Sequence, residues 1–286
     1  MGKRCAAIRG FVAQDLKCLV TSAKFYVVLL AVSIGLLTCF QGLRNYLSAA
    51  GSSINPFELY TVCVSNRISL WIVYIGEVVL LCDAPFRRKG DYSRILHSSR
   101  KIWMTGQFLF SSVCIVLYTL FLVLFFMGLS CGHWSFSNSW SEAYLKGSVS
   151  SESVGILYAI VFWPELLSAT PLAAFLISAS LQILFGLFIS GVIALLHLLS
   201  KPKAGIVFCT VFPLIDYLLL TTFCFPWCWT VARFLSPFSL STFFRLNVIT
   251  SHGPSVLFAA VYLLLLLFGL LGAMYQKVKT YDFFSI

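Results

Sequence analysis

The feature that most constrains the fold of this chain is a series of long apolar runs between residues 25 and 275. A helix needs about 20 mainly apolar residues to cross a bilayer, and only helices or closed barrels satisfy their backbone groups there. Six runs reach or approach that length: 25–43, 68–85, 107–129, 171–199, 204–225 and 255–275. The polar stretches between them are too short to fold alone. We therefore predict an all-α, polytopic integral membrane protein with one transmembrane domain, 1–286.

The composition agrees with a membrane protein. Hydrophobic residues make up 59% of the chain, against roughly 45–50% in soluble domains. The net charge of +10 fits basic residues that flank membrane spans and face anionic lipid. Nucleic acid is not an expected partner, because no basic stripe is interleaved with aromatic residues that would stack bases.

Two segments are less regular than the six runs. Residues 4–24 place apolar side chains at spacings of three and four, which predicts an amphipathic helix at the inner membrane face. The alternative is that this segment continues the first span inward. The run 154–167 is short and ends near Pro164, so we expect a re-entrant or interfacial helix within an outer segment 130–170. The sequence Thr170-Pro171 predicts the start of the fourth spanning helix.

The distribution of basic residues predicts the orientation. With the N-terminus in the cytoplasm, 15 of the 20 Lys and Arg residues lie inside and 5 lie outside. If 154–167 crosses the membrane, the split falls to 13 against 7. The positive-inside rule favours the first arrangement. We therefore predict that both termini are cytoplasmic and that the larger loops, near 44–67, 130–170 and 226–254, are outside.

A polar island separates the second and third runs, within residues 84–106. It is either a solvated connector, as the positive-inside rule allows for any membrane protein, or an element that docks a soluble partner. Gly90 can end the preceding helix, and Asp91 can cap a new helix over 92–101. One face of that helix would carry Tyr92, Ile95, Leu96 and Ser99, and another would carry Arg94, Ser98 and Lys101. A short amphipathic helix of this kind suits a groove in a partner.

The island also carries a family resemblance. The run DAPFRRKGDYSRILHSSRKIWMTGQ resembles the first cytoplasmic loop of bacterial ATP-binding cassette (ABC) permeases of the type-2 exporter class. The amphipathic N-terminal segment, the six runs and LSPFSL at 235–240 are also similar to that class. The long, partly apolar segment 130–170 departs from its better-known members, so no cargo is inferred from them.

The resemblance implies a multi-pass permease subunit in the bacterial plasma membrane, dimeric with itself or a related permease. It would export a lipid, peptide, antibiotic or glycan. A separate nucleotide-binding ATPase would bind ATP-Mg and push on the coupling loop 84–106. The implied contact residues are Arg87, Arg88, Asp91, Tyr92, Arg94, Ile95, Leu96, Ser98, Ser99 and Arg100. This chain contains no GxxxxGK[ST] phosphate-binding motif, so ATP must be used by a partner.

Three acidic residues lie within or beside the apolar runs. Glu77 either belongs to a polar pathway or is protonated and hydrogen-bonded between helices, and both readings stay open. Asp83 is expected to pair with Arg87 at i+4. Asp216, three residues after Pro213, is expected to satisfy backbone groups freed at a proline kink.

Two classes of function other than an exporter are a non-transporting membrane protein and an enzyme. A non-transporting membrane protein, such as an assembly factor or a membrane sensor, is the alternative to an exporter. We do not expect an enzyme, because acids, histidines and nucleophiles do not converge in the sequence. For the same reason we predict no catalytic, cofactor-binding or metal-binding residues in this chain.

Overall fold

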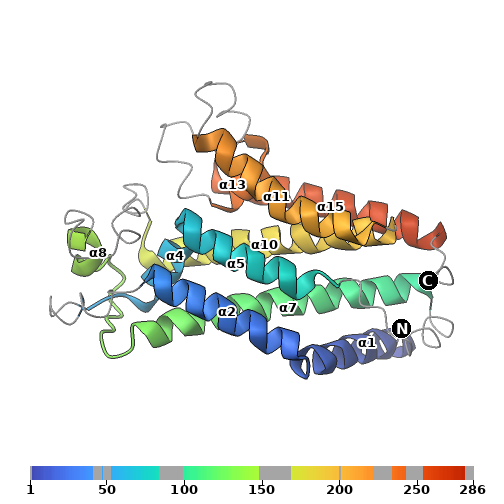
Figure 1. Ribbon diagram of the computed structural model, residues 1–286, viewed down its shortest axis with the longest axis horizontal. Helices are drawn as coiled ribbons and strands as arrows, with labels where there is room; N and C mark the ends of the chain where they lie inside the picture. The colour runs from blue at the N-terminus through green and yellow to red at the C-terminus, as the bar shows by residue number, and fades with distance from the viewer. Residues whose placement is uncertain are drawn as a thin grey trace.

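The computed structural model describes residues 2–40, 47, 53–83, 99–147, 169–199, 201–221, 234–242 and 254–280. In these ranges the named elements are all helices (Figure 1). They are α1 (Gly2–Val20), α2 (Ala23–Cys39), α4 (Pro56–Ser65), α5 (Arg67–Leu81), α7 (Arg100–Leu129), α8 (Glu142–Gly147), α10 (Pro171–Leu198), α11 (Pro202–Thr221), α13 (Pro237–Ser241) and α15 (Val256–Thr280). The predicted all-α class is confirmed for this part of the chain.

The described parts of the six predicted spans fall on helices, namely α2, α5, α7, α10, α11 and α15. Three of these, α7, α10 and α15, are long and apolar enough to cross a membrane unaided. The count rises to five if the bent pairs α1–α2 and α4–α5 are each one span. The apolar part of α11 that the structure describes, Lys203–Ile215, is shorter. The helices are therefore those of a membrane-embedded protein, but six crossings are not confirmed.

The N-terminal segment forms a helix, as predicted, but it does not continue straight into the first span. Helices α1 and α2 meet at a bend of 63°. At the bend, the Ser22 side chain accepts a hydrogen bond from the Phe25 backbone N–H and caps α2. Helix α1 packs along α7, where Phe11 lies against Gly106 and Gln107 donates to Asp15 at 2.8 Å. Its position relative to a membrane stays a prediction.

Helix α4 corrects the prediction of an outer loop over 44–67. It is ten residues long and almost wholly buried. Asn55 caps its start, Pro56 fills the first turn, and Asn66 follows its end. Asn66 also caps α5 by accepting hydrogen bonds from the backbone N–H groups of Ile68 and Ser69. One extended residue therefore separates two helices that meet at 85°.

Helix α10 is the central element of the bundle. It contacts α4, α5, α7, α11, α13 and α15. The predicted start signal is confirmed, because Thr170 caps α10 and Pro171 lies in its first turn. Its 28 residues extend over about 42 Å, more than the roughly 30 Å of a bilayer core.

The start of α1, the start of α7 and the end of α15 lie at the same end of the bundle (Figure 1). Arg100 of α7 donates to the backbone carbonyl of Lys279 in α15 at 2.7 Å. Helix α8 lies at the opposite end. We call the end where α1 and α7 begin and α15 ends the basic end of the bundle. The helices that meet there contain Arg9, Arg100, Lys203 and Lys279.

Candidate functional site

The strongest candidate site surrounds Glu77, near the middle of the bundle. Glu77 projects from α5 and is 1% exposed. Four polar side chains from other helices lie near its carboxyl group: Tyr60 of α4, Tyr118 of α7, Gln182 of α10 and Cys209 of α11. We call these five residues the polar centre. None of the five is a cation, so the carboxyl group has no opposite charge among them.

Glycines allow the helices to approach the polar centre closely. A Cβ at position 186 of α10 would overlap Glu77 Oε1 and would lie 3.0 Å from the Ile115 side chain. A Cβ at Gly76 would overlap the Tyr118 hydroxyl group. That hydroxyl donates to the Val73 carbonyl at 2.9 Å, which joins α7 to α5. The space for the carboxyl group therefore exists because residue 186 has no side chain.

Several polar atoms of the centre lack a hydrogen-bond partner among the described residues. They are Glu77 Oε2, the Tyr60 hydroxyl and both amide atoms of Gln182. Gln182 is close enough to interact with the Glu77 carboxyl group, but the heavy-atom geometry is not that of a full hydrogen bond. Buried polar groups are satisfied in the great majority of cases, and unsatisfied ones cost about 1–3 kcal/mol each. The four unsatisfied atoms near Glu77 therefore make the polar centre a candidate functional site.

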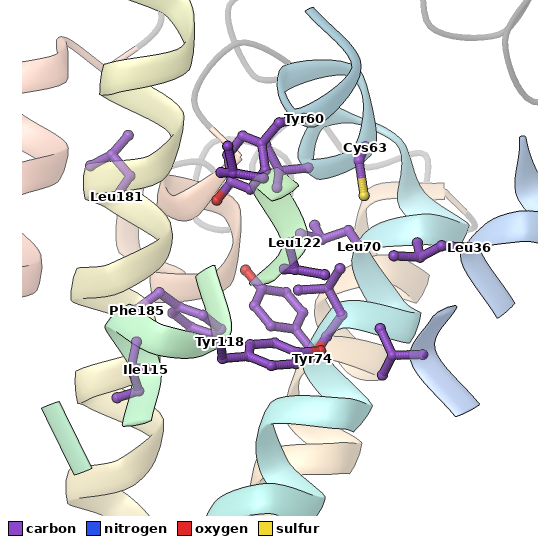
Figure 2. Close-up of a cluster of buried hydrophobic side chains, with 14 of the residues drawn as sticks. Leu36, Tyr60, Cys63, Leu70, Tyr74, Ile115, Tyr118, Leu122, Leu181 and Phe185 are labelled. Atoms are coloured by element: carbon purple, nitrogen blue, oxygen red, sulfur yellow. The ribbon is translucent and has the colours of Figure 1, made fainter. Parts of the chain in front are cut away.

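Aromatic side chains enclose the polar centre. Figure 2 shows Tyr74, Tyr118 and Phe185 gathered between α5, α7 and α10, with Tyr60 nearby on α4. Tyr74 lies 4.8 Å from Phe185 and 5.0 Å from Phe238, measured between ring centroids. The Tyr74 hydroxyl is also hydrogen-bonded to Ser241 of α13. The segment LSPFSL thus supplies the Phe238 ring that packs against Tyr74, and the next residue, Ser241, supplies the hydroxyl group.

A second buried acid holds the outer segment against the bundle. Both carboxylate oxygens of Glu58 accept hydrogen bonds of 2.6 Å from Ser141, one from its backbone N–H and one from its hydroxyl group. The Asn55 amide donates to the Ser137 carbonyl at 2.7 Å, and Ile54 forms a parallel bridge with Trp134. The described part of 130–170 is therefore attached to the start of α4.

The predicted intramembrane acids are not brought together. Glu77 is buried in the polar centre, whereas Asp83 is exposed after the end of α5. Asp83 forms an ion pair with Lys24 of α2, at 2.6 Å. Its predicted partner Arg87 lies outside the described residues. Asp216 follows Pro213 inside α11, but its side chain is not described.

Most of the predicted coupling residues lie outside the described part of the chain. They are Arg87, Arg88, Asp91, Tyr92, Arg94, Ile95, Leu96 and Ser98. Only Ser99 and Arg100 are described, and here the predicted helix 92–101 is wrong at its end. Ser99 has an extended backbone and caps α7, which begins at Arg100 and not near 107. The capping serine explains the difference, because an N-cap residue leaves the helical conformation. The predicted re-entrant helix 154–167 is also outside the described residues.

Sequence reasoning identified Glu77 but missed its partners and Glu58. Tyr60 and Gln182 are polar residues in apolar runs, and nothing in one sequence tells which neighbour they face. Glu58 had a weak signal, because Asn55-Pro56 before an apolar run is typical of a helix start. Among the residues that the structure describes, no three His, Cys, Asp or Glu side chains gather to hold a metal ion.

Comparison with known proteins identifies no relative: no family model matches the chain, and neither a curated protein nor a solved structure is significantly similar to it.

Proposed function

We propose that this chain is the membrane-spanning subunit of an ATP-driven exporter, and that the segment 84–106 receives the force of a separate ATPase. The observation that carries the proposal is how this segment joins the bundle. On one side, Asp83 pairs with Lys24 at 2.6 Å. On the other side, Arg100 donates to the Lys279 carbonyl at 2.7 Å. The residue before the segment is thus attached to α2, and Arg100 within the segment is attached to α15.

These attachments give a mechanical route from the segment to the interior. A push on the segment acts on the end of α5 and on the start of α7. Helix α5 carries Glu77 and α7 carries Tyr118, so both helices connect the segment directly with the polar centre. Packed helices move as rigid units that slide or rotate between discrete arrangements. A displacement of the segment would therefore change the packing around Glu77.

The proposed orientation places the basic end of the bundle in the cytoplasm of a bacterium, with the chain multi-pass in the plasma membrane. Basic residues cluster on the cytoplasmic side of membrane proteins, and α1, α7 and α15 bring such residues to one end. An ATPase would bind the subunit there. The chain would act as a dimer with a second permease, so that two coupling segments meet two ATPase subunits.

Co-purification tests the proposal. The chain is solubilised gently from its native membrane, and ATPase activity in the purified sample is measured. We expect an ATPase to accompany it, and we expect Arg94→Glu to abolish the association. Lys203→Glu is the matched control, because it reverses an exposed basic charge in α11 at the basic end but outside the segment. Equal loss in both variants, or no ATPase with the unaltered chain, would reject the proposal.

The orientation has its own test. Ser98→Cys is introduced after the ten native cysteines are replaced, and intact cells are treated with a thiol reagent that does not cross membranes. We expect labelling only after the cells are opened. Labelling in intact cells would place the segment outside the cell, where an ATPase that uses cytoplasmic ATP could not bind it.

A further inference from the structure

A line of small and polar residues runs along the buried face of α10. Its members are one helical turn apart and are all buried: Ser178, Gln182, Gly186, Ser190 and Ala194. Two buried polar residues of α7, Gln107 and Ser111, lie beside Ser190 of this face. Neighbours at i and i+4 share one face of a helix. The buried face of α10 therefore carries a polar seam, and Glu77 of α5 lies against Gly186 at its middle.

The unsatisfied atoms around Glu77 define what the seam can bind. An ionised carboxylate in an apolar interior is costly unless it is paired with an opposite charge. The groups that face Glu77 from α4, α7, α10 and α11 are Tyr60, Tyr118, Gln182 and Cys209, and none is a cation. On the α2 side, Gly76 faces the apolar Val32. A proton is thus the ligand that removes the charge.

The Gln182 amide is the matching partner for a protonated carboxyl group. Its carbonyl oxygen accepts no hydrogen bond among the described residues, and neither does Glu77 Oε2. A neutral carboxylic acid has one O–H donor, whereas a carboxylate only accepts. A proton on Glu77 Oε2 would therefore give this oxygen and the Gln182 amide oxygen a shared hydrogen bond.

A small crevice lies beside the seam, toward the basic end. Gln107 and Ser111 of α7 line it together with Ser190 of α10, and Met274 of α15 closes one side. Ser190 is one turn from Gly186, whose missing side chain makes room for the Glu77 carboxyl group. The hydroxyl groups can hydrogen-bond to water between the crevice and the site.

We propose that Glu77 is a proton-binding site, neutral and hydrogen-bonded to Gln182 in this packed arrangement, which exchanges its proton with the basic end through Ser190 and Ser111. The inference goes beyond export and does not depend on it, because the site would bind a proton in a sensor or an assembly factor as well. Ionisation of Glu77 requires water or a cation to enter between α5 and α10. Opening of that interface and release of the proton are therefore linked.

Infrared spectroscopy of the chain in lipid bilayers at neutral pH tests the protonation directly. A protonated carboxyl group has a carbonyl stretch that is distinct from the carboxylate bands and shifts in heavy water. We expect this band to lose intensity in Glu77→Gln. Glu58→Gln is the control for the other buried glutamate, whose two carboxyl oxygens accept hydrogen bonds from Ser141. A band of unchanged intensity in Glu77→Gln would overturn the proposal.

A second variant covers the case in which Glu77→Gln does not fold. Gln182→Met keeps the volume of the side chain but removes the acceptor, so we expect the carbonyl stretch to move to higher frequency. An unchanged frequency would show that Gln182 is not the partner. Replacing sodium by choline at constant pH should leave the band unchanged. A band that appears only without sodium would assign the site to a metal cation and overturn the proposal.

The rate at which the acid proton exchanges for deuterium tests the route. We expect Ser190→Ala to slow the exchange of the Glu77 proton by about fivefold or more, because one hydrogen-bonding step is lost. Ser178→Ala is the matched control, since Ser178 lies on the same face of α10 but on the far side of Gln182 from the crevice. Slowing by Ser178→Ala alone would show that the proton enters from the opposite end.

Discussion

Substitution of Gly186 by alanine places one methyl group in the polar centre. In the present packing its Cβ would overlap Glu77 Oε1 and would lie 3.0 Å from both the Glu77 carboxyl carbon and the Ile115 side chain. Glu77 and Ile115 are both about 1% exposed, so neither side chain can move aside freely. An extra methyl group in a packed core costs about 1–3 kcal/mol, and glycine to alanine within a helix returns roughly 0.5–1 kcal/mol. We expect Gly186→Ala to destabilise the chain by up to about 2.5 kcal/mol.

Gly269→Ala is the matched control for this substitution. Gly269 also lies inside a long apolar helix, α15, but a Cβ there meets nothing within 4 Å. Only the backbone effect remains, so we expect the control to be neutral or to stabilise the chain by about 0.5–1 kcal/mol. The two glycines should therefore differ in the sign of their effect.

A double-mutant cycle with Glu77→Ala identifies the cause. Removing the carboxyl group opens the space that the new methyl group needs, so we expect Gly186→Ala to be neutral or stabilising in that background. The coupling energy should be about 1–3 kcal/mol. Unfolding is followed by circular dichroism in detergent, either on heating or by titration with a denaturing detergent. Equal destabilisation by Gly186→Ala in both backgrounds would refute the reasoning, because the methyl group would then clash with something other than Glu77.

Three further substitutions test the packing elsewhere. Ser141→Ala removes one of the two donors to Glu58, which should cost about 1.5–3 kcal/mol and speed proteolysis of the outer segment in a time course. Asn66→Ala removes the cap of α5 and should lower the free energy of unfolding by about 1 kcal/mol; an unchanged melting temperature would contradict that role. The side chains of Lys24 and Asp83 are 30% and 61% exposed, so a double-mutant cycle should give only about 0.2–1 kcal/mol, and high salt should reduce it further.

The helix α4 shows where reading from the sequence fails. Its ten residues are too few to cross a bilayer. From the sequence alone, this region is therefore predicted to be a loop between two spans. Tertiary packing decides otherwise, because α4 inserts its whole surface between α5, α7 and α10. Asn55 and Asn66 are the local signals that mark its ends. They predict where a short helix begins and ends, but not that the bundle leaves room for it.

The polar island within residues 84–106 shows a different limit of prediction from the sequence. The start of α7 at Arg100 follows from one serine cap, which the sequence contains but does not distinguish from the neighbouring Ser98. Arg100 is turned toward Lys279, which is 179 residues away in the chain. Such a contact depends on how α7 and α15 are placed side by side. The part of the island that would meet an ATPase stays a prediction from family resemblance.

The amino-acid sequence by itself determined the helical class, the approximate positions of the six apolar helices and the concentration of basic residues at one set of helix ends. These properties follow from local hydropathy and hydrogen bonding, which need only neighbouring residues. Only the tertiary structure decided that Glu77 meets Tyr60, Tyr118 and Gln182, and that Gly186 leaves the space for its carboxyl group. Those contacts depend on which faces of four separate helices pack together, and that choice is made by the shape of the whole bundle.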